Sequence, residues 1–519
     1  MAGALAVSAF AAPATADTKT LTFANFRDIR DVNPHGYGGA MFAQDWLYDG
    51  LLVLDENAEP SPALAESFRV SEDGKVYTFN LREGVTFSDG HPFNAEVAKQ
   101  NLDAILANED RHNWLKSMQL MLAYQATGAD AIEAVDENTL RINLTEAYYP
   151  FVIELAVTRP YRMISPNCFV DGGTMEGVSC TVGTGAYALE SNTVDQEAVF
   201  VRHEGHWGAA PEIDKIVVKV IPDAQARLLA LQNGEIDMIY GKDMIPPRSF
   251  LDLEKREGFS TVMSPPVATK MLILNASKPA LSDGALRSAL NYYTNRELIS
   301  ERIMLGLEPP AGTLMSEAIP YADIGLDPFS FQPERADALL TEAGYEKVDG
   351  KWTKDGAPIE LKLTYNSDDA TQKILSQFLQ SEWGKLGIAL EIAAVERQAQ
   401  RDTLRTGDFE VAFNVSWGLP YDPQSFLGSM VKPVYGDFHA QSGLSNKAEI
   451  DAAIGGALGA VDEGKRQDFY SYVLSSLHEG SIYVPLTFEA NRAVYSDKLG
   501  DVVFNINQFE VPVERMSLK

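Results

Sequence analysis

The segment Asn414-Val-Ser-Trp-Gly-Leu-Pro-Tyr-Asp-Pro-Gln-Ser-Phe-Leu-Gly-Ser-Met430 places two large aromatic residues in a tight turn. Gly418 and Pro420 interrupt an apolar run, so the pattern predicts a strand end, a sharp turn and the start of a new element. Trp417 and Tyr421 flank this turn. Each has an apolar body and a polar tip, which suits the wall of a cleft for a small ligand. The alternative is a loop that packs its Trp on the core.

Two further stretches, like this turn, resemble parts of one known protein family. They are Arg111-His-Asn-Trp114 and Tyr148-Tyr-Pro-Phe-Val-Ile-Glu-Leu-Ala-Val-Thr-Arg-Pro-Tyr-Arg162. Together the three stretches resemble the nickel-binding periplasmic proteins of ABC importers, in the dipeptide, oligopeptide and nickel family of extracellular solute-binding proteins (family 5). The resemblance runs from about Leu21 to Ser517. It implies an α/β, two-lobed periplasmic binding protein (type II, cluster C), with an extra subdomain in the first lobe and a hinge between the lobes.

Length and charge limit the classes of function. A chain of 519 residues exceeds one compact core, so two or more lobes are expected. Its hydrophobic content of 45% is that of a folded globular protein. Lys and Arg number 43 against 73 Asp and Glu, which gives a net charge of −30. Such a field repels polyanions, so we expect no nucleic-acid partner.

The first residues have the pattern of a secretory signal. Residues 2–12 are small and apolar, and Ala14-Thr-Ala16 fits the small-residue cleavage pattern before Asp17. We interpret residues 1–16 as the remnant of a signal peptide. The first cysteine is Cys168, so no Cys follows the signal to carry a lipid anchor, and we expect a freely soluble periplasmic protein. No later stretch has 18 or more consecutive apolar residues, so no membrane span is predicted.

Two other patterns bear on disulfides and metals. Only Cys168 and Cys180 occur, and in an oxidising compartment they can form a short-range disulfide. Two free structural thiols are the alternative, and two cysteines alone make a poor zinc site. His203-Glu-Gly-His206 lacks the helical His-Glu-x-x-His spacing, so we interpret it as a surface turn.

Strands and helices alternate along the chain. The pattern predicts hairpins around Asp73-Gly74 and around residues 136–138, and a helix that Asn94 caps. It also predicts a helix at 286–304, a strand at 359–365, and a helix at 371–386 stopped by Gly387. This alternation implies crossover connections and a sheet with helices on its faces. The chain is expected to leave the first lobe near residue 265 and re-enter it near 487, which makes a hinge. The predicted domains are lobe I at 17–265 with an inserted subdomain at about 57–182, lobe II at 266–486, and lobe I again at 487–519.

The resemblance also implies a ligand site. In the nickel binders a Tyr and a Met near the first helix touch the ligand, and these match Tyr37 and Met41. An Arg in the third stretch grips a carboxylate of the metal's chelator there, and it matches Arg159. Arg suits this role because its planar fork pairs both oxygens of a carboxylate. The alternatives are a structural ion pair for Arg159 and a core position for Met41. The implied ligand-binding residues are Tyr37, Met41, Trp114, Arg159, Trp417 and Tyr421.

The sequence departs from that family at the metal ligand. The best-known nickel binders carry a coordinating His shortly after the Ser-Met pair of the turn, and Tyr435 stands there in this chain. His439 follows four residues later and could substitute if the loop shifts. We interpret His35 and His112 as structural. The metal ligand is therefore left open, and a chelator such as histidine would supply the imidazole nitrogen and carboxylate oxygen that nickel accepts.

The sequence lacks three common catalytic and nucleotide-binding motifs. There is no Gly-x-Ser-x-Gly elbow, no phosphate-binding Gly-Lys-Ser/Thr loop and no Gly-x-Gly-x-x-Gly fingerprint, so we expect no enzyme and no catalytic cofactor. The rival function is a dipeptide or oligopeptide carrier. Those proteins place an Asp three residues after the Trp to pair the peptide's ammonium group. Pro420 stands there, or Leu419 in the other register, and neither holds a cation.

The sequence thus predicts a periplasmic solute-binding protein of an ABC importer. It is expected to capture a metal chelate, nickel with a small carboxylate chelator such as histidine, and to deliver it to the permease in the inner membrane. We expect it to act as a monomer.

Overall fold

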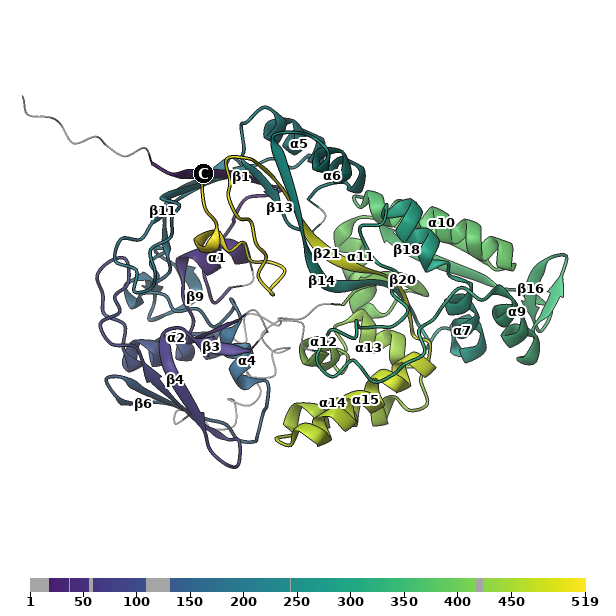
Figure 1. The fold of residues 1–519 in the computed structure, drawn as a ribbon. Coiled ribbons are helices and arrows are strands. Elements are labelled where there is room, and N and C mark those ends of the chain that lie inside the picture. The colour runs from purple at the N-terminus through teal and green to yellow at the C-terminus, as the bar shows by residue number, and fades with distance from the viewer. Residues whose placement is uncertain (1–17, 37, 56–58, 109–130, 243, 417–422) are drawn as a thin grey trace, which may run out of the picture.

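One sheet of ten strands runs through the whole molecule (Figure 1). The computed structural model describes residues 18–36, 38–55, 59–108, 131–242, 244–416 and 423–519. In spatial order the strands are β10 (Tyr187–Thr193), β11 (Glu197–Arg202), β12 (Lys215–Val220), β1 (Thr20–Asn25), β13 (Met238–Tyr240), β21 (Tyr483–Ser496), β14 (Phe259–Leu274), β20 (Val411–Val415), β18 (Glu360–Asn366) and β19 (Ala389–Val395). We call the part around β10–β13 and β1 lobe I, and the part around β18–β20 lobe II.

Two long antiparallel strands, β14 and β21, belong to both lobes. One end of β21 pairs with β13 of lobe I, and one end of β14 pairs with β20 of lobe II. The register between them shifts around Pro266, and Pro cannot donate a ladder hydrogen bond, so the pairing is interrupted where the chain passes between the lobes. The crossings predicted near 265 and 487 fall within these strands. The domain boundaries stay predictions.

Lobe I carries a second, four-stranded sheet. It consists of β4 (Ala65–Val70), β5 (Val76–Leu81), β7 (Thr139–Asn143) and β6 (Ile132–Asp136). Its two hairpins are those predicted at Asp73-Gly74 and at 136–138, and Gly74 has the positive φ of 71° that the first turn needs. The predicted cap Asn94 accepts a hydrogen bond from Val97 N at 3.0 Å and begins helix α2 (Ala95–Ala107).

Shorter elements complete lobe I. They are α1 (Met41–Leu47), β2 (Leu52–Leu54), β3 (Pro60–Pro62), α4 (Phe151–Ala156), η3 (Pro166–Cys168), β8 (Phe169–Val170), β9 (Gly173–Val178), α5 (Ala224–Gln232), α6 (Pro247–Glu254) and η6 (Val513–Arg515). Cys168 and Cys180 form a disulfide across the β8–β9 hairpin, so the first of the two alternatives holds.

Helices cover the lobe II sheet. Its further elements are η4 (Ala280–Ser282), α7 (Gly284–Tyr293), α8 (Arg296–Leu298), η5 (Ile299–Ile303), α9 (Pro333–Glu342), β15 (Glu346–Val348), β16 (Lys351–Lys354), β17 (Ala357–Pro358), α10 (Ala370–Leu386), α11 (Arg397–Thr406), α12 (Pro423–Ser429), α13 (Gly436–Gln441), α14 (Lys447–Gly459) and α15 (Glu463–Glu479). Leucines of α7, α9 and α10 pack with Leu361 and Leu363 of β18 in one buried cluster. Within the described part of the chain, none of the helices has the length and apolar character of a membrane span.

The helix predicted at 286–304 is interrupted, because the chain leaves the helical conformation after Tyr293 and resumes it at Arg296. Asn295 starts a new turn by accepting a hydrogen bond from Leu298 N at 2.9 Å. The buried Arg296 guanidinium donates to the carbonyls of Asn291 and Thr294 at 2.8 and 3.1 Å. These bonds satisfy carbonyls that end α7, so side-chain partners replace the next helical turn.

Candidate ligand-binding cleft

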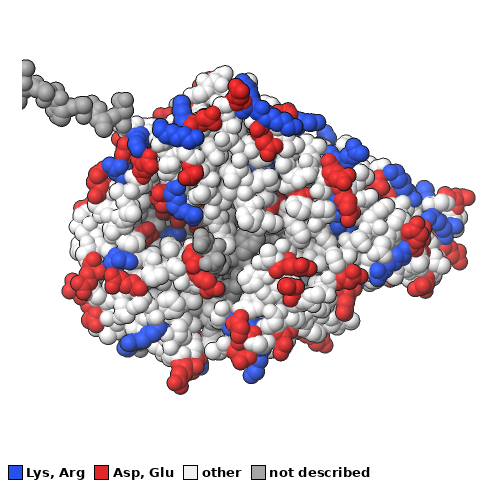
Figure 2. Space-filling view, in the orientation of Figure 1, with Lys and Arg blue, Asp and Glu red and all other residues white. Residues whose placement is uncertain are grey.

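The face between the two lobes is hollowed, and acidic side chains lie on both lobes around it (Figure 2). The ligand loop is the stretch at 414–430 that resembles the family's loop, and its described ends belong to β20 and α12. It leaves β20 at Ser416, whose hydroxyl accepts a hydrogen bond from Thr269 N of β14 at 2.7 Å. It re-enters the described chain at Pro423, where α12 begins. The predicted strand end and the predicted start of a new element are therefore confirmed, and the turn between them lies outside the described residues. Four proposed contact residues lie outside the described residues, namely Tyr37, Trp114, Trp417 and Tyr421.

The fold brings Arg159 to the segment that carries Met41. The Arg159 Nη1 atom donates to the carbonyl of Gly39 at 3.3 Å, two residues before Met41, and the Arg side chain is half-buried. Met41 is buried at the first position of α1. Gly39 permits this arrangement, because a Cβ there would lie 2.3 Å from the carbonyl oxygen of Asp31. Two residues far apart in the sequence thus share one side of lobe I, and their contacts with a ligand stay predictions.

Arg162 and His35 fix the segment at 35–45, which carries Met41, to the rest of lobe I. Arg162 is buried and its Nη2 pairs with Asp45 Oδ1 of α1 at 2.7 Å. His35 is fully buried, with Nδ1 2.9 Å from Thr174 Oγ1 and Nε2 3.1 Å from the Arg162 carbonyl. Burial lowers the pKa of His35 to about 4, so the ring is neutral at neutral pH and its Nε2–H donates to the carbonyl. Both residues are structural, as the sequence indicated for His35.

His439, which could replace the missing metal ligand, has backbone partners for its ring. His439 Nε2 lies 3.0 Å from the carbonyls of both Arg405 and Pro433, and this fixes the ring against the end of α11. Tyr435 precedes α13, and its backbone N–H donates to Lys432 O at 3.2 Å. His112 lies outside the described residues. Among the described residues, no group of three or more His, Cys, Asp or Glu side chains is placed to hold a metal ion.

The other histidine pair forms part of a turn. His203 Nδ1 and His206 Nδ1 each lie 3.0 Å from a backbone carbonyl, those of Gly185 and Thr184. These contacts fit the interpretation of the segment as a structural turn.

A buried carboxylate supports the strand end that leads into the ligand loop. Asp437 of α13 is 2% exposed. Its Oδ1 accepts from the Tyr483 hydroxyl and the Asn414 amide, both at 3.0 Å. Burial raises the pKa of Asp437 to about 6, although these hydrogen bonds lower it. The carboxylate therefore links the last residues of β20 to α13 and β21. Its ionisation in this buried position lowers the stability of the folded protein.

The raised pKa of Asp437 predicts a pH dependence of stability. Between about pH 4 and 6 the folded protein keeps a proton on Asp437 that the unfolded chain releases, so this residue lowers the free energy of unfolding as the pH rises. We expect Asp437→Asn, which cannot ionise, to lose less thermal stability than the wild type between pH 5 and 7.5. Melting curves at both pH values give the comparison. An equal loss in the two proteins would contradict the raised pKa.

A cluster of charges that the sequence did not reveal lies on the strands shared by the lobes. We call Lys242, Lys270, Glu308, Glu489 and Arg492 the hinge ion cluster. Lys270 Nζ lies 3.0 Å from Glu489 Oε1 and 3.2 Å from Glu308 Oε2, and Lys242 also pairs with Glu489. Arg492 Nη2 lies 3.8 Å from Glu308 Oε1.

Part of the hinge ion cluster lies beside the end of β20. Burial raises the pKa of Glu489, but the charges of Lys242 and Lys270 outweigh it and lower the pKa to about 2. A cavity of about 60 Å³ is lined by these three residues together with Asn414 and Val415 at the end of β20. One signal in the sequence was the placement of Lys270 directly before the apolar run 271–274, and of Glu489 shortly after the apolar residues 482–486.

A sheet that two lobes share through two long strands, with a hollow between the lobes, defines a two-lobed solute-binding protein of type II. The chain belongs to the bacterial extracellular solute-binding proteins of family 5, whose middle region matches residues 59–437. The predicted family and fold class are thereby confirmed.

Known relatives differ in the ligand that their names state. The nickel-binding periplasmic protein of Escherichia coli K12 is 37% identical over 493 residues, which cover 94% of this chain and 93% of the relative. The crystal structure of NikA from Brucella suis in complex with Fe(III)-EDTA has a TM-score of 0.92 and 38% identity, and covers 96% of this chain and all of that one. The glutathione-binding protein GsiB of Salmonella typhi is 28% identical over 512 residues, 96% of this chain and 93% of the relative.

Proposed function

We propose that this protein is the periplasmic receptor of an ABC importer and that it captures nickel as a complex with a small carboxylate chelator such as histidine. The observation that carries the proposal is the position of Arg159 beside Gly39 and the start of α1, which carries Met41. The names of two similar proteins support it, since one states nickel and the other an iron complex of EDTA, a chelator with carboxylates.

The proposed binding mechanism needs no chemistry beyond recognition and closure. Arg159 would neutralise and orient a chelator carboxylate through its planar fork. Met41, Tyr37 and Trp114 would form the wall on lobe I, while Trp417 and Tyr421 would enclose the complex from lobe II. Closing of the lobes would exclude water and so strengthen the charge interaction.

The family supports a proposal for the compartment and the partner of this protein. Family 5 consists of extracellular solute-binding proteins, and the disulfide in lobe I is typical of an oxidising compartment. We therefore place the protein in the periplasm as a non-enzymatic monomer that hands its ligand to the importer's permease.

A peptide ligand is the second candidate, because one relative is a glutathione-binding protein. The chain lacks the Asp that would pair a peptide ammonium group, since Pro420 or Leu419 stands at that position. Loss of such a charge pair weakens binding by about 2–5 kcal/mol, which favours the metal chelate.

Thermal melting distinguishes these ligands. We expect nickel with L-histidine to raise the melting temperature more than nickel alone, glutathione or a panel of di- and tripeptides. A ligand at 100 times its dissociation constant adds about 2.7 kcal/mol to the free energy of unfolding, which a melting curve detects readily. Nickel alone should act weakly, because Tyr435 replaces the coordinating His. Stabilisation by peptides and none by metal chelates would refute the proposal in favour of a peptide carrier.

A further inference from the structure

The two lobes touch at a second place, on the side away from their shared strands. Figure 1 shows α14 and α15 at the lower side of the molecule, with β14 and β21 above. The backbone N–H of Tyr149, in lobe I between β7 and α4, donates to the carbonyl of Leu458 in α14 at 3.1 Å. The β4–β5 turn also approaches lobe II, since a Cβ on Gly74 would lie 3.3 Å from Val461 Cγ2. This contact is separate from the hinge.

Arg466 of α15 stands at the centre of this contact. Its side chain is fully buried, and its guanidinium carbon lies 3.1 Å from the centre of the Tyr149 ring. A guanidinium placed over an aromatic face is attracted by the ring, and more strongly when water is excluded.

Lobe II alone holds the guanidinium in this position. Nη1 donates to Glu463 Oε2 at 2.5 Å and to the Tyr321 hydroxyl at 3.1 Å, and Nη2 donates to the Ala460 carbonyl at 2.6 Å. All three of these acceptors belong to lobe II, whereas the Tyr149 ring belongs to lobe I. Opening of the lobes would remove the ring and leave the three hydrogen bonds intact.

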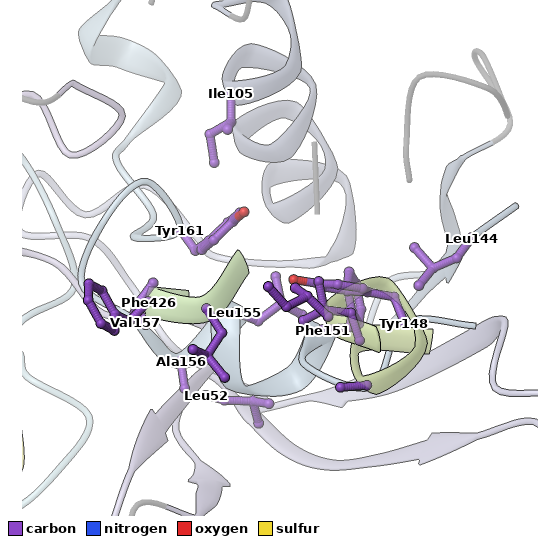
Figure 3. Close-up of a cluster of buried hydrophobic side chains, with 14 of the residues drawn as sticks. Leu52, Ile105, Leu144, Tyr148, Phe151, Leu155, Ala156, Val157, Tyr161 and Phe426 are labelled. Carbon is purple, nitrogen blue, oxygen red and sulfur yellow. The ribbon is translucent and has the colours of Figure 1, made fainter. Parts of the chain in front are cut away.

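A second contact between the lobes is apolar and lies nearer the ligand loop. Phe426 of α12 and Val157 at the end of α4 belong to one buried hydrophobic cluster (Figure 3), and the two side chains are only 1% and 3% exposed. Phe426 follows the end of the ligand loop by a few residues. Separation of the lobes would expose both side chains to water, so this contact also favours the closed arrangement.

We propose that Tyr149 and Arg466 form a clasp that stabilises the closed arrangement of the lobes and thereby sets ligand affinity and residence time. Arg466 presents a guanidinium already fixed by lobe II, so closing orders few additional groups. A receptor whose closed state is more populated binds its ligand more tightly by the same factor. The inference rests on two lobes that move about a hinge and not on the identity of the ligand.

Substitution of Tyr149 tests the clasp without disturbing the buried Arg466. We expect Tyr149→Leu to weaken the affinity for nickel with L-histidine about tenfold, which corresponds to about 1.4 kcal/mol, through faster dissociation at an unchanged association rate. Tyr149→Phe keeps the aromatic face over Arg466 and loses only the hydroxyl's hydrogen bond with Tyr321, so its loss of affinity should be clearly smaller than that of Tyr149→Leu. Tyr472→Leu, at an exposed position of the same helix α15, is the matched control and should have no effect.

Small-angle scattering of the ligand-free proteins provides a readout that does not depend on the proposed ligand. The clasp predicts a larger radius of gyration for Tyr149→Leu than for the wild type or Tyr149→Phe, with similar melting temperatures. Should nickel with L-histidine fail to bind the wild type, the proposed function is wrong and scattering alone decides on the clasp. The clasp is overturned if the three proteins have the same radius of gyration and, when the ligand binds them, the same dissociation rate. Equal effects of Leu and Phe also overturn it.

Discussion

Arg159→Ala is expected to weaken the binding of nickel with L-histidine by about 30-fold to several-thousand-fold, the range given by the loss of one partner of a buried charge pair. The reason is geometric, because the guanidinium lies beside the Gly39 carbonyl and the start of α1, where a chelator carboxylate would meet it. Arg159→Lys should recover only part of the affinity, since an ammonium cannot bind two oxygens of a carboxylate at once. Isothermal titration calorimetry measures all three proteins.

A matched control separates this role from a general effect of lost charge. Arg141 also lies in lobe I, where it pairs with Glu133 at 3.1 Å while both side chains are more than a third exposed. Arg141→Ala should therefore leave the affinity unchanged and alter stability by at most about 1 kcal/mol. Wild-type affinity in Arg159→Ala, with the fold intact by circular dichroism, would show that the chelator carboxylate binds elsewhere.

Local signals predicted those elements whose ends are fixed by neighbouring residues. The Asp73-Gly74 turn, the Asn94 cap and the stop at Gly387 each depend on one side chain or one positive φ, so the sequence alone contains the information. Helix α11 was not predicted, because Gln400 is its only buried residue and no apolar period marks it.

Contacts between distant segments could not be predicted in this way. The break after α7 depends on the buried Arg296, whose partners lie partly on β21. The hinge ion cluster joins Lys270 of β14 to Glu489 of β21, and the Tyr149–Arg466 contact joins the two lobes. Such pairs are set by tertiary packing, and a single sequence contains no periodicity that identifies them.

The ligand site was accessible mainly through family resemblance. Resemblance placed Arg159 and Met41 in one site, and the structure brings their segments together. It gave no information on Asp437, which binds Asn414 at the start of the ligand loop, since an Asp in the first turn of a helix has many uses. The aromatic residues of the proposed site, Trp114 among them, stay predictions.

Glu489→Gln is expected to lower the free energy of unfolding by about 3–5 kcal/mol, the usual effect of breaking a buried ion pair from one side. Glu489 is 2% exposed and pairs with both Lys242 and Lys270, so the substitution leaves two ammonium groups with less compensation. Glu308 remains as a partner of Lys270 at 3.2 Å, which places the expected loss nearer the lower value. Urea unfolding at pH 7 provides the measurement, and a second substitution, Lys242→Met, should restore part of the stability.

The pH dependence of this loss identifies its electrostatic origin. Because the pKa of Glu489 is lowered to about 2 in the folded protein, its stabilising contribution is complete above the ordinary carboxyl range and is lost as the pH falls toward 2. The difference between wild type and Glu489→Gln should thus be full at pH 6–7 and smaller at pH 3.5. Glu190→Gln removes an exposed pair with Lys215 at 2.9 Å and should change stability by at most about 1 kcal/mol. A difference that is the same at pH 7 and pH 3.5 would mean that Glu489 acts through packing and not through its charge.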